Sequence, residues 1–417
     1  MPHQNAVVDT AALMDPDTYV DGVPHALLAE LREQASVHRV GDFWAVLRHA
    51  EVRHVLRSPT VFSSHLGGTQ VRDPATPEAL RYVRRMMLNQ DPPEHTRLRG
   101  LLTRAFTPRA VARLTERIEG WAREIVGRAA AKGEFDFAKE VADLPLLTLA
   151  EVFGVPVEDR GLLFDWSNRV IGYEDTDYAA SSAFTGGTDL ARAALALRPA
   201  PGPDGRMPDP RTRDGMPDLY AYAHGLAERK RRSPGDDVMS ALMAGDVSTE
   251  EFENLFWLFS VAGNETLRNG IPGGMIALLS TPDAPVDDLG TAVEEMLRWW
   301  TPVMNFRRTA AVDTELGGRR IRAGEKVVVW FSSANRDPRV FDRPDVFDPA
   351  RRPNDHLSFG HGPHFCLGAQ LARAQMRAVF GAVAALPGRL VAAGPPLRLR
   401  STFQNGVKSL PVRLAAR

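Results

Sequence analysis

The feature that most constrains this chain is the ten-residue segment around its single cysteine, Phe-Gly-His-Gly-Pro-His-Phe-Cys-Leu-Gly at residues 359–368. Two glycines before Cys366 and one after it allow a tight loop that can lie flat against a large planar ligand. A helix is predicted to begin near Leu367, and its positive end would favour the thiolate form of Cys366. The sequence therefore predicts a sulfur presented to a ligand by a loop at the start of a helix.

The composition limits what this cysteine can do. One cysteine in 417 residues excludes an internal disulfide and a zinc site built on two thiolates. A lone cysteine is often a small buried hydrophobic residue, so a glycine-rich turn around an inert thiol is the alternative interpretation. The net charge of -1 favours neither nucleic acid nor a membrane as partner. Residues 1–12 lack a leader pattern and no run of eighteen apolar residues occurs, so we expect a cytoplasmic protein.

Apolar periodicity predicts a mainly α chain with small β-sheets. Residues 248–251, Ser-Thr-Glu-Glu, form a capping-box pattern that opens an apolar stretch running to about Leu279. As one helix this stretch would span roughly 45 Å, and its apolar character on all sides predicts a central, buried position. Pro272 lacks a backbone donor, so we expect the helix to kink there.

An acid and an alcohol stand midway along this apolar stretch, in Ala262-Gly263-Asn264-Glu265-Thr266. Polar side chains in an apolar helix need a reason. The Thr266 hydroxyl can bond the carbonyl of Ala262 four residues earlier and open the helix locally, while Gly263 leaves room for a ligand. A kinked core helix with a satisfied threonine is the alternative.

Two further pairs lie at helical spacing. His95 and Arg99 are four apart in a helix that Asp91 is predicted to cap, so together they can hold one anionic group. Glu295 and Arg298 are three apart and share a helix face. A basic surface and a solvated ion pair are the respective alternatives.

The cysteine segment resembles the cytochrome P-450 signature, Phe-x-x-Gly-x-x-x-Cys-x-Gly, at every fixed position. The resemblance extends over about residues 40–415. It implies the cytochrome P-450 fold, a mainly α triangular prism with haem between the central long helix and the helix after the cysteine loop. It also implies a single domain over residues 1–417, with a flexible N-terminus at 1–20 and a lid loop at 198–218. The segment 173–218 is longer than in most relatives.

The same resemblance assigns roles to individual residues. It implies haem b with Cys366 as the axial ligand of the iron, and O2 as co-substrate. Glu265 and Thr266 resemble the oxygen-activating acid and alcohol, and Arg351 resembles the residue that completes a structural lock with Glu295 and Arg298. The remaining positions that it places around the haem are His95, Arg99, Ala262, Arg308, Phe359, Gly360, His364 and Gly368.

The implied activity is a monooxygenase that acts on a hydrophobic or amphiphilic small molecule, such as a terpenoid, steroid, fatty acyl chain or aromatic. One cysteine cannot hold an iron–sulfur cluster, so electrons are expected from a separate ferredoxin and its reductase, docked near Arg104, Arg109 or Arg377. A haem-thiolate protein that rearranges substrates, uses peroxide or senses a ligand is an alternative, as is a haem-free binding protein. The residues expected to line the substrate site are Met86, Leu88, Val261, Val303, Met304, Phe306 and Phe403.

Overall fold

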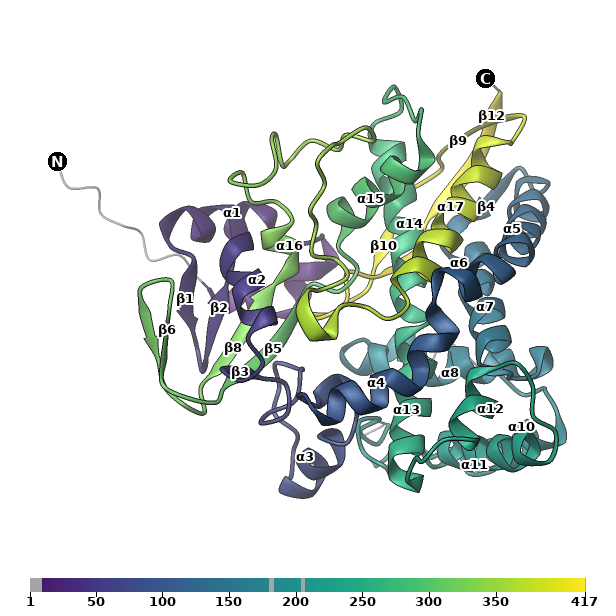
Figure 1. Cartoon of the computed structure of the whole chain (residues 1–417). Coiled ribbons are helices and arrows are strands. Elements are labelled where there is room, and N and C mark those ends of the chain that lie inside the picture. Colours follow the sequence, from purple (N-terminus) through teal and green to yellow (C-terminus); the bar gives the residue numbers. More distant parts are fainter. Residues whose placement is uncertain (1–9, 180–183, 204–206, 417) are drawn as a thin grey trace.

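Two consecutive helices, α13 (Thr249–Ala262) and α14 (Glu265–Ser280), run end to end through the middle of the molecule (Figure 1). The structure is a computed structural model that describes residues 10–179, 184–203 and 207–416. The predicted capping box is confirmed, because the Ser248 hydroxyl accepts from the Glu251 N–H while the Glu251 carboxylate accepts from the Ser248 N–H. The course of α13 and α14 in Figure 1 confirms the central position expected of this stretch.

Small residues let α14 approach its neighbours closely. A Cβ on Gly273 would lie 2.1 Å from the ring of Trp300, and one on Gly274 would lie 2.9 Å from Phe380. These contacts join α14 to α15 (Leu289–Trp300) and α17 (Ala369–Ala384), and α17 packs along α5 (Pro108–Ala130). The cysteine loop comes immediately before α17, so this packing fixes the loop against the central helices.

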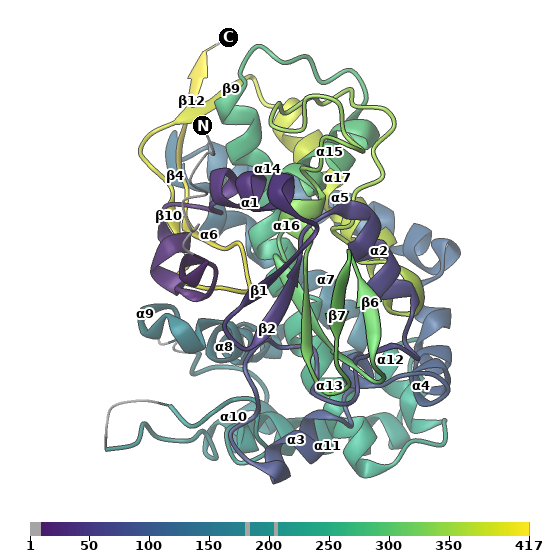
Figure 2. The same ribbon diagram turned by 90° about the vertical axis from the view of Figure 1, so that its left-hand side faces the viewer.

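The largest sheet lies beside the helices and has the strand order β1-β2-β8-β5-β3, whose strands are labelled in Figure 1 and whose β1 and β2 are labelled again in Figure 2. Only β2 and β8 pair in parallel. A hairpin of β6 and β7 turns at Gly317 and Gly318, whose φ angles of +56° and +73° suit glycine. The strands are β1 (Val37–Val40), β2 (Phe43–Val46), β3 (Phe62–Ser63), β4 (Glu134–Asp136), β5 (Asn305–Ala310), β6 (Thr314–Leu316), β7 (Arg319–Ile321), β8 (Lys326–Trp330), β9 (Gly388–Ala392), β10 (Leu397–Arg398), β11 (Val407–Ser409) and β12 (Pro411–Ala416).

Helices account for most of the remaining regular structure, which agrees with the mainly α class predicted from the sequence. Within the described residues, no helix combines the length and apolar character needed to cross a bilayer. The other helices are α1 (His25–Gln34), α2 (His49–Arg57), α3 (Pro77–Val83), α4 (Glu94–Thr103), α6 (Phe137–Val141), α7 (Asp143–Phe153), α8 (Arg160–Ile171), α9 (Thr176–Ala179), α10 (Asp189–Leu195), α11 (Pro217–Arg232), α12 (Val238–Met243) and α16 (Phe331–Ala334).

Two expectations are wrong: that one helix runs from residue 248 to about 279, and that Asp91 caps α4. The kink expected at Pro272 stays a prediction. The central helix breaks at Gly263 and Asn264, whereas Pro272 lies inside an unbroken α14. Local hydrogen bonding decides the position of the break, because the Thr266 hydroxyl donates to the Ala262 carbonyl at 3.0 Å, as the sequence predicted. Asp91 does not cap α4, which begins at Glu94, because its carboxylate accepts from Ser63 and Ser64 instead.

Part of the N-terminal segment that the sequence predicts to be flexible belongs to the described residues, and its flexibility stays a prediction. Residues 1–9 lie outside the described residues, but residues 11–20 form two 3-10 helices, Ala11–Met14 and Pro16–Val20. Leu13 and Tyr19 are buried there, and the Tyr19 hydroxyl donates to the Leu13 carbonyl at 3.0 Å. This part of the terminus is packed because its apolar side chains reach the core beside α1.

The predicted lid loop lies against the first half of α13. Arg213 forms an ion pair with Glu253, and the Trp257 indole donates to the Pro210 carbonyl at 3.0 Å. Residues 204–206 lie outside the described part, and α11 begins at Pro217. The lid role of residues 198–218 stays a prediction, as does the single domain.

Candidate haem-binding and catalytic site

A cavity of about 250 Å3 separates the break in the central helix from the cysteine loop. Cys366 lines one side of it, and Ala262, Gly263 and Thr266 line another. Elements far apart in sequence thus enclose one apolar space. Among the residues predicted for the site, the cavity brings together Leu88, His95, Arg99, Ala262, Thr266, Val303, Phe306, Arg308, Phe359, Gly360, His364, Cys366 and Gly368.

The cysteine loop owes its shape to its glycines and to short backbone bonds. Gly360 and Gly362 have φ angles of +69° and +72°, and a Cβ on Gly362 would lie 2.5 Å from the Leu56 carbonyl oxygen. The Cys366 N–H donates to the Phe359 carbonyl at 2.9 Å, which closes the loop. The Arg373 guanidinium lies 4.5 Å from the Phe359 ring centroid and packs the loop against α17.

Cys366 is exposed, and it lines the cavity. Burial raises the pKa of this thiol, although the Gly368 N–H and the nearby Arg99 and Arg373 guanidinium groups oppose the rise. The Gly368 N–H at the start of α17 therefore favours the thiolate, as the sequence predicted, but in the protein alone burial outweighs it. Coordination to a metal cation would supply the missing stabilisation.

Four basic side chains gather at one edge of the cavity: His95, Arg99, Arg308 and His364. Burial lowers the pKa of Arg308 to about 10, and burial together with the neighbouring arginines lowers the pKa of His95 to about 4 and that of His364 to about 2. The rings of His95 and His364 lie 4.1 Å apart between centroids. Neither Arg99 nor Arg308 forms an ion pair with any described residue, and the buried His95 Nδ1 has no partner among them.

These observations fit the group that the sequence implies. Buried cations without carboxylate partners are unfavourable, and a ligand that carries two carboxylates would compensate them. Haem has two propionates at one edge and an iron atom that binds a thiolate. The donor set therefore suits haem at both points of attachment.

The side chains of Thr266 and Glu265, which are adjacent in sequence, lie in different surroundings. Thr266 lines the cavity, whereas Glu265 is 1% exposed and does not line it. The Glu265 carboxylate is paired with Arg268 at 2.9 Å and accepts from the Tyr178 hydroxyl at 2.5 Å. The catalytic role predicted for Glu265 stays a prediction, and any action on the cavity must pass through other groups.

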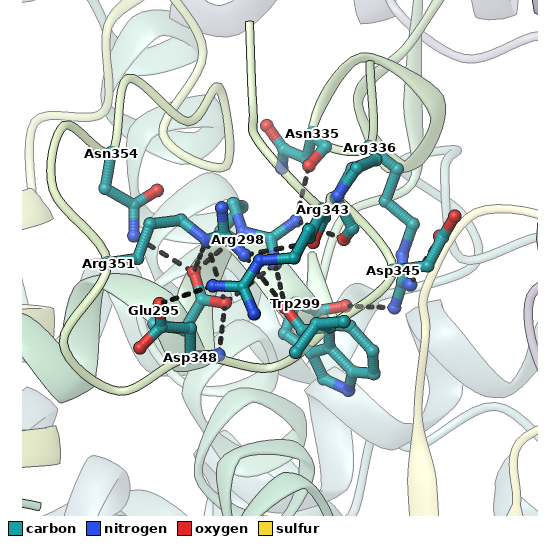
Figure 3. A network of polar contacts seen from close by, with 12 residues as sticks. Glu295, Arg298, Trp299, Asn335, Arg336, Arg343, Asp345, Asp348, Arg351 and Asn354 are labelled. Carbon is teal, nitrogen blue, oxygen red and sulfur yellow. Dashed lines mark hydrogen bonds and ion pairs between the residues drawn. The ribbon is translucent and has the colours of Figure 1, made fainter. Parts of the chain in front are cut away.

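Glu295, Arg298 and Arg351 form one buried network, as the sequence predicted (Figure 3). The Arg298 guanidinium donates to both Glu295 carboxylate oxygens at 2.7 Å, and Arg351 donates to them at 3.1 and 3.2 Å. The two arginines also donate to backbone carbonyls of the irregular segment after α16. These acceptors are Asn335, Pro344 and Val346 for Arg298, and Asp342, Arg343 and Val346 for Arg351.

Asn335 connects this network to the cysteine loop. Its amide donates to the Ser358 hydroxyl at 2.9 Å and its side-chain oxygen accepts from the Leu357 N–H at 2.7 Å. Ser358 in turn donates to the Leu297 carbonyl at 2.7 Å. No local pattern singles out Asn335, because all these partners are distant in sequence, and sequence reasoning therefore missed it.

The predicted substrate-lining residues fall into three groups. Leu88, Val303 and Phe306 line the cavity, whereas Val261 and Met304 do not. Met86 and Phe403 line a smaller cavity nearby, which Leu88 also borders. Sequence reasoning missed several apolar residues of the main cavity, because ordinary core periodicity does not distinguish them: Leu149, Val152, Phe153, Phe259, Leu267 and Phe331.

Comparison with known proteins gives a consistent result. The family model described as "Cytochrome P450" matches residues 289–383. The chain is 38% identical over 422 residues to a steroid C26-monooxygenase of Rhodococcus jostii, covering 95% of this chain and 83% of that protein. It is 37% identical over 386 residues to a methyl-branched lipid omega-hydroxylase of Mycobacterium bovis, covering 88% and 83%. Among solved structures, Mycobacterium marinum cytochrome P450 CYP268A2 in complex with pseudoionone has a TM-score of 0.83 and 34% identity, covering 98% of this chain and 99% of that one.

Proposed function

Because this chain belongs to the cytochrome P450 family and is a monooxygenase of that family, we propose that it inserts one oxygen atom of O2 into an apolar or amphiphilic molecule held beside Thr266. The observation that carries this proposal is the cavity itself. The Cys366 sulfur and the Thr266 hydroxyl face it from separate elements, and unpaired basic groups line its edge. That arrangement would supply a thiolate to bind the iron, a hydroxyl to handle protons, and basic groups to hold two carboxylates.

The residues present assign the haem contacts. Cys366 would bind the iron, and His95, Arg99, Arg308 and His364 would hold the propionates. We propose haem b, since covalent attachment of the c type requires two cysteines and the chain has one. When bound, the haem supplies the activation of O2.

The protein's own contribution is to exclude water and direct protons. Apolar side chains enclose the cavity, and they would limit the water that reaches the reacting atoms. The Thr266 hydroxyl donates a hydrogen bond to the Ala262 carbonyl. The Thr266 oxygen can therefore accept a hydrogen bond from a group in the cavity. Glu265 stands one residue earlier, behind the helix wall, where we propose that it supports proton delivery through intervening groups. This hydroxyl favours the use of O2 over a rearrangement or peroxide-driven reaction.

The relatives suggest a substrate class. The names of the similar proteins specify a steroid and a methyl-branched lipid as substrates. The apolar lining of this cavity suits the same kind of molecule, so we propose a steroid, terpenoid or branched lipid. Electrons would come from a ferredoxin and its reductase, because the single cysteine cannot hold an iron–sulfur cluster.

The proposal is tested by the absorption spectrum of the purified, haem-containing protein after reduction and exposure to carbon monoxide. The parent protein should show the red-shifted Soret band of thiolate ligation. Cys366→Ser should lose this band, and Cys366→His should move it to the position of histidine ligation. Circular dichroism would establish that both variants are folded. A folded parent protein that binds no haem, or a thiolate band that survives in Cys366→Ser, would overturn the proposal.

A further inference from the structure

A second cavity of about 130 Å3 lies next to the one in front of Cys366. We call it the outer chamber and the cavity in front of Cys366 the inner cavity. Segments from four parts of the chain form the walls of the outer chamber. They contribute Met14; residues 69–72 with Val83, Met86, Leu88 and Asn89; Val170, Ile171, Glu174, Arg211 and Trp257; and Asn305 with Ser401, Thr402 and Phe403.

The partition between the two spaces is thin and apolar. Leu88 borders both, while Phe306 lines the inner cavity and Phe403 lines the outer chamber. The Phe306 and Phe403 rings are 5.6 Å apart between centroids and inclined by 54°, so they contact each other across the boundary. Side-chain rotation at this boundary would join the two spaces into one elongated site.

Most polar groups of the outer chamber already have partners. Glu174 is paired with Arg72 at 2.6 Å and accepts from the Thr402 N–H and hydroxyl. Asn305 donates to the Thr402 carbonyl at 2.8 Å. Arg211 forms a two-pronged pair with Asp209, at 2.9 Å for both bonds. Each arginine of the chamber is thus balanced by a carboxylate, and the chamber has no net charge to attract an ion.

Gln70 differs from its neighbours. Its side chain is half-buried and lines the outer chamber, yet its amide makes no hydrogen bond with any described residue. A side-chain amide both donates and accepts, and the amide of Gln70 is accessible and free to bond a ligand in the chamber that it lines. An uncharged oxygen of a ligand would satisfy it without disturbing the paired charges around it.

We propose that the outer chamber binds the neutral polar end of an elongated substrate, a carbonyl or a hydroxyl, through Gln70, while the apolar end reaches the inner cavity beside Thr266. This assignment rests on the proposed function and makes it more specific. Oxidation would then occur at the end of the molecule remote from its polar group. Gln70 acts here as a specificity-determining residue.

The test is a titration of the haem-containing protein with four twelve-carbon probes, followed by the shift in haem spin state. The probes are dodecan-2-one, dodecan-1-ol, dodecane and dodecanoate. We expect the parent protein to bind the ketone and the alcohol about fivefold to tenfold more tightly than dodecane, the range of one neutral hydrogen bond. Gln70→Leu should remove this preference and leave the affinity for dodecane within about twofold. Gln34→Leu, on the exposed face of α1, is the matched control and should behave as the parent.

Each outcome of the titration either supports or contradicts the role assigned to Gln70. Equal affinities of the parent protein for the ketone, the alcohol and dodecane would overturn the assignment, as would a preference that persists in Gln70→Leu. Tighter binding of dodecanoate than of the ketone would show that the chamber selects an anion, which also contradicts it. The carbon monoxide spectrum of the same preparation separates this failure from failure of the proposed function, because thiolate ligation does not depend on Gln70. Comparison of the ketone and the alcohol identifies which neutral group the chamber prefers.

Discussion

At the scale of single residues, the surroundings of Glu265 define its role more closely than its place in a motif does. Its carboxylate contacts the Arg268 guanidinium, the Tyr178 hydroxyl and, at 3.1 Å, the Asn269 amide. Arg268 also donates to Asn168 at 2.7 Å and lies 4.0 Å from the Phe164 ring centroid. The pair therefore ties the start of α14 to α8 and α9.

Glu265→Gln should lower the free energy of unfolding by about 3 kcal/mol, because it leaves the buried Arg268 charge without its counter-ion. Urea denaturation followed by circular dichroism measures this loss. The double variant Glu265→Gln/Arg268→Met is the control, and it should recover much of the stability because no buried charge remains. Unchanged stability in Glu265→Gln, together with more peroxide released per O2 consumed, would show that the carboxylate serves proton delivery alone.

At the scale of elements, the sequence predicted best the features that depend on residues close to one another in the chain. The bond from Thr266 to Ala262 and the tight turn at Cys366 each depend on residues within a few positions, and both occur. Pro272 lies inside an unbroken α14, and Gly273 and Gly274 seat that helix closely against its neighbours, while the kink expected at Pro272 stays a prediction. The positions of Asn335 and Gln70 could not be predicted, since contacts distant in sequence create their surroundings.

The ion pair between Glu294 on α15 and Arg373 on α17 should make the stability of the protein depend on pH. Burial alone would raise the pKa of Glu294, but hydrogen bonds from Arg373 and His356 outweigh it and lower the pKa to about 2. Because this value is below that of an unfolded glutamate, the stabilisation is fully present above about pH 4.5 and is lost as pH falls toward 2. Glu294→Gln should cost about 1–2 kcal/mol at pH 7 and almost nothing near pH 2.

Thermal unfolding of the parent and of Glu294→Gln across that pH range measures the effect. Glu116→Gln, at an exposed position of α5, is the control for removal of one charge. A difference between the parent and Glu294→Gln that stays constant with pH would contradict the prediction.

At the scale of the whole molecule, α5 and α17 pack side by side next to the cysteine loop (Figure 1). Arg109 and Arg377 are exposed on these two helices, and neither pairs with a described carboxylate. The side chain of Arg104 lies outside the described residues. An acidic ferredoxin would meet two uncompensated cations on this pair of helices.

Arg377→Glu should weaken ferredoxin binding and slow the first electron transfer by about tenfold at low salt, with the difference shrinking as ionic strength rises. Stopped-flow reduction of the haem by an acidic ferredoxin measures this rate. Arg231→Glu on α11, away from this surface, is the matched control. Equal rates for Arg377→Glu and the parent at low salt would exclude this surface as the docking site.

The way Arg298 and Arg351 hold the irregular chain after α16 has a consequence for how this region can evolve. Their guanidinium groups recognise backbone carbonyls, a group that every amino acid carries, and not the side chains of the residues they hold. Substitutions along residues 342–346 therefore leave the acceptors in place, whereas an inserted or deleted residue would move them out of reach. We therefore expect related proteins to vary in amino-acid identity at residues 342–346 and to conserve the length of this segment.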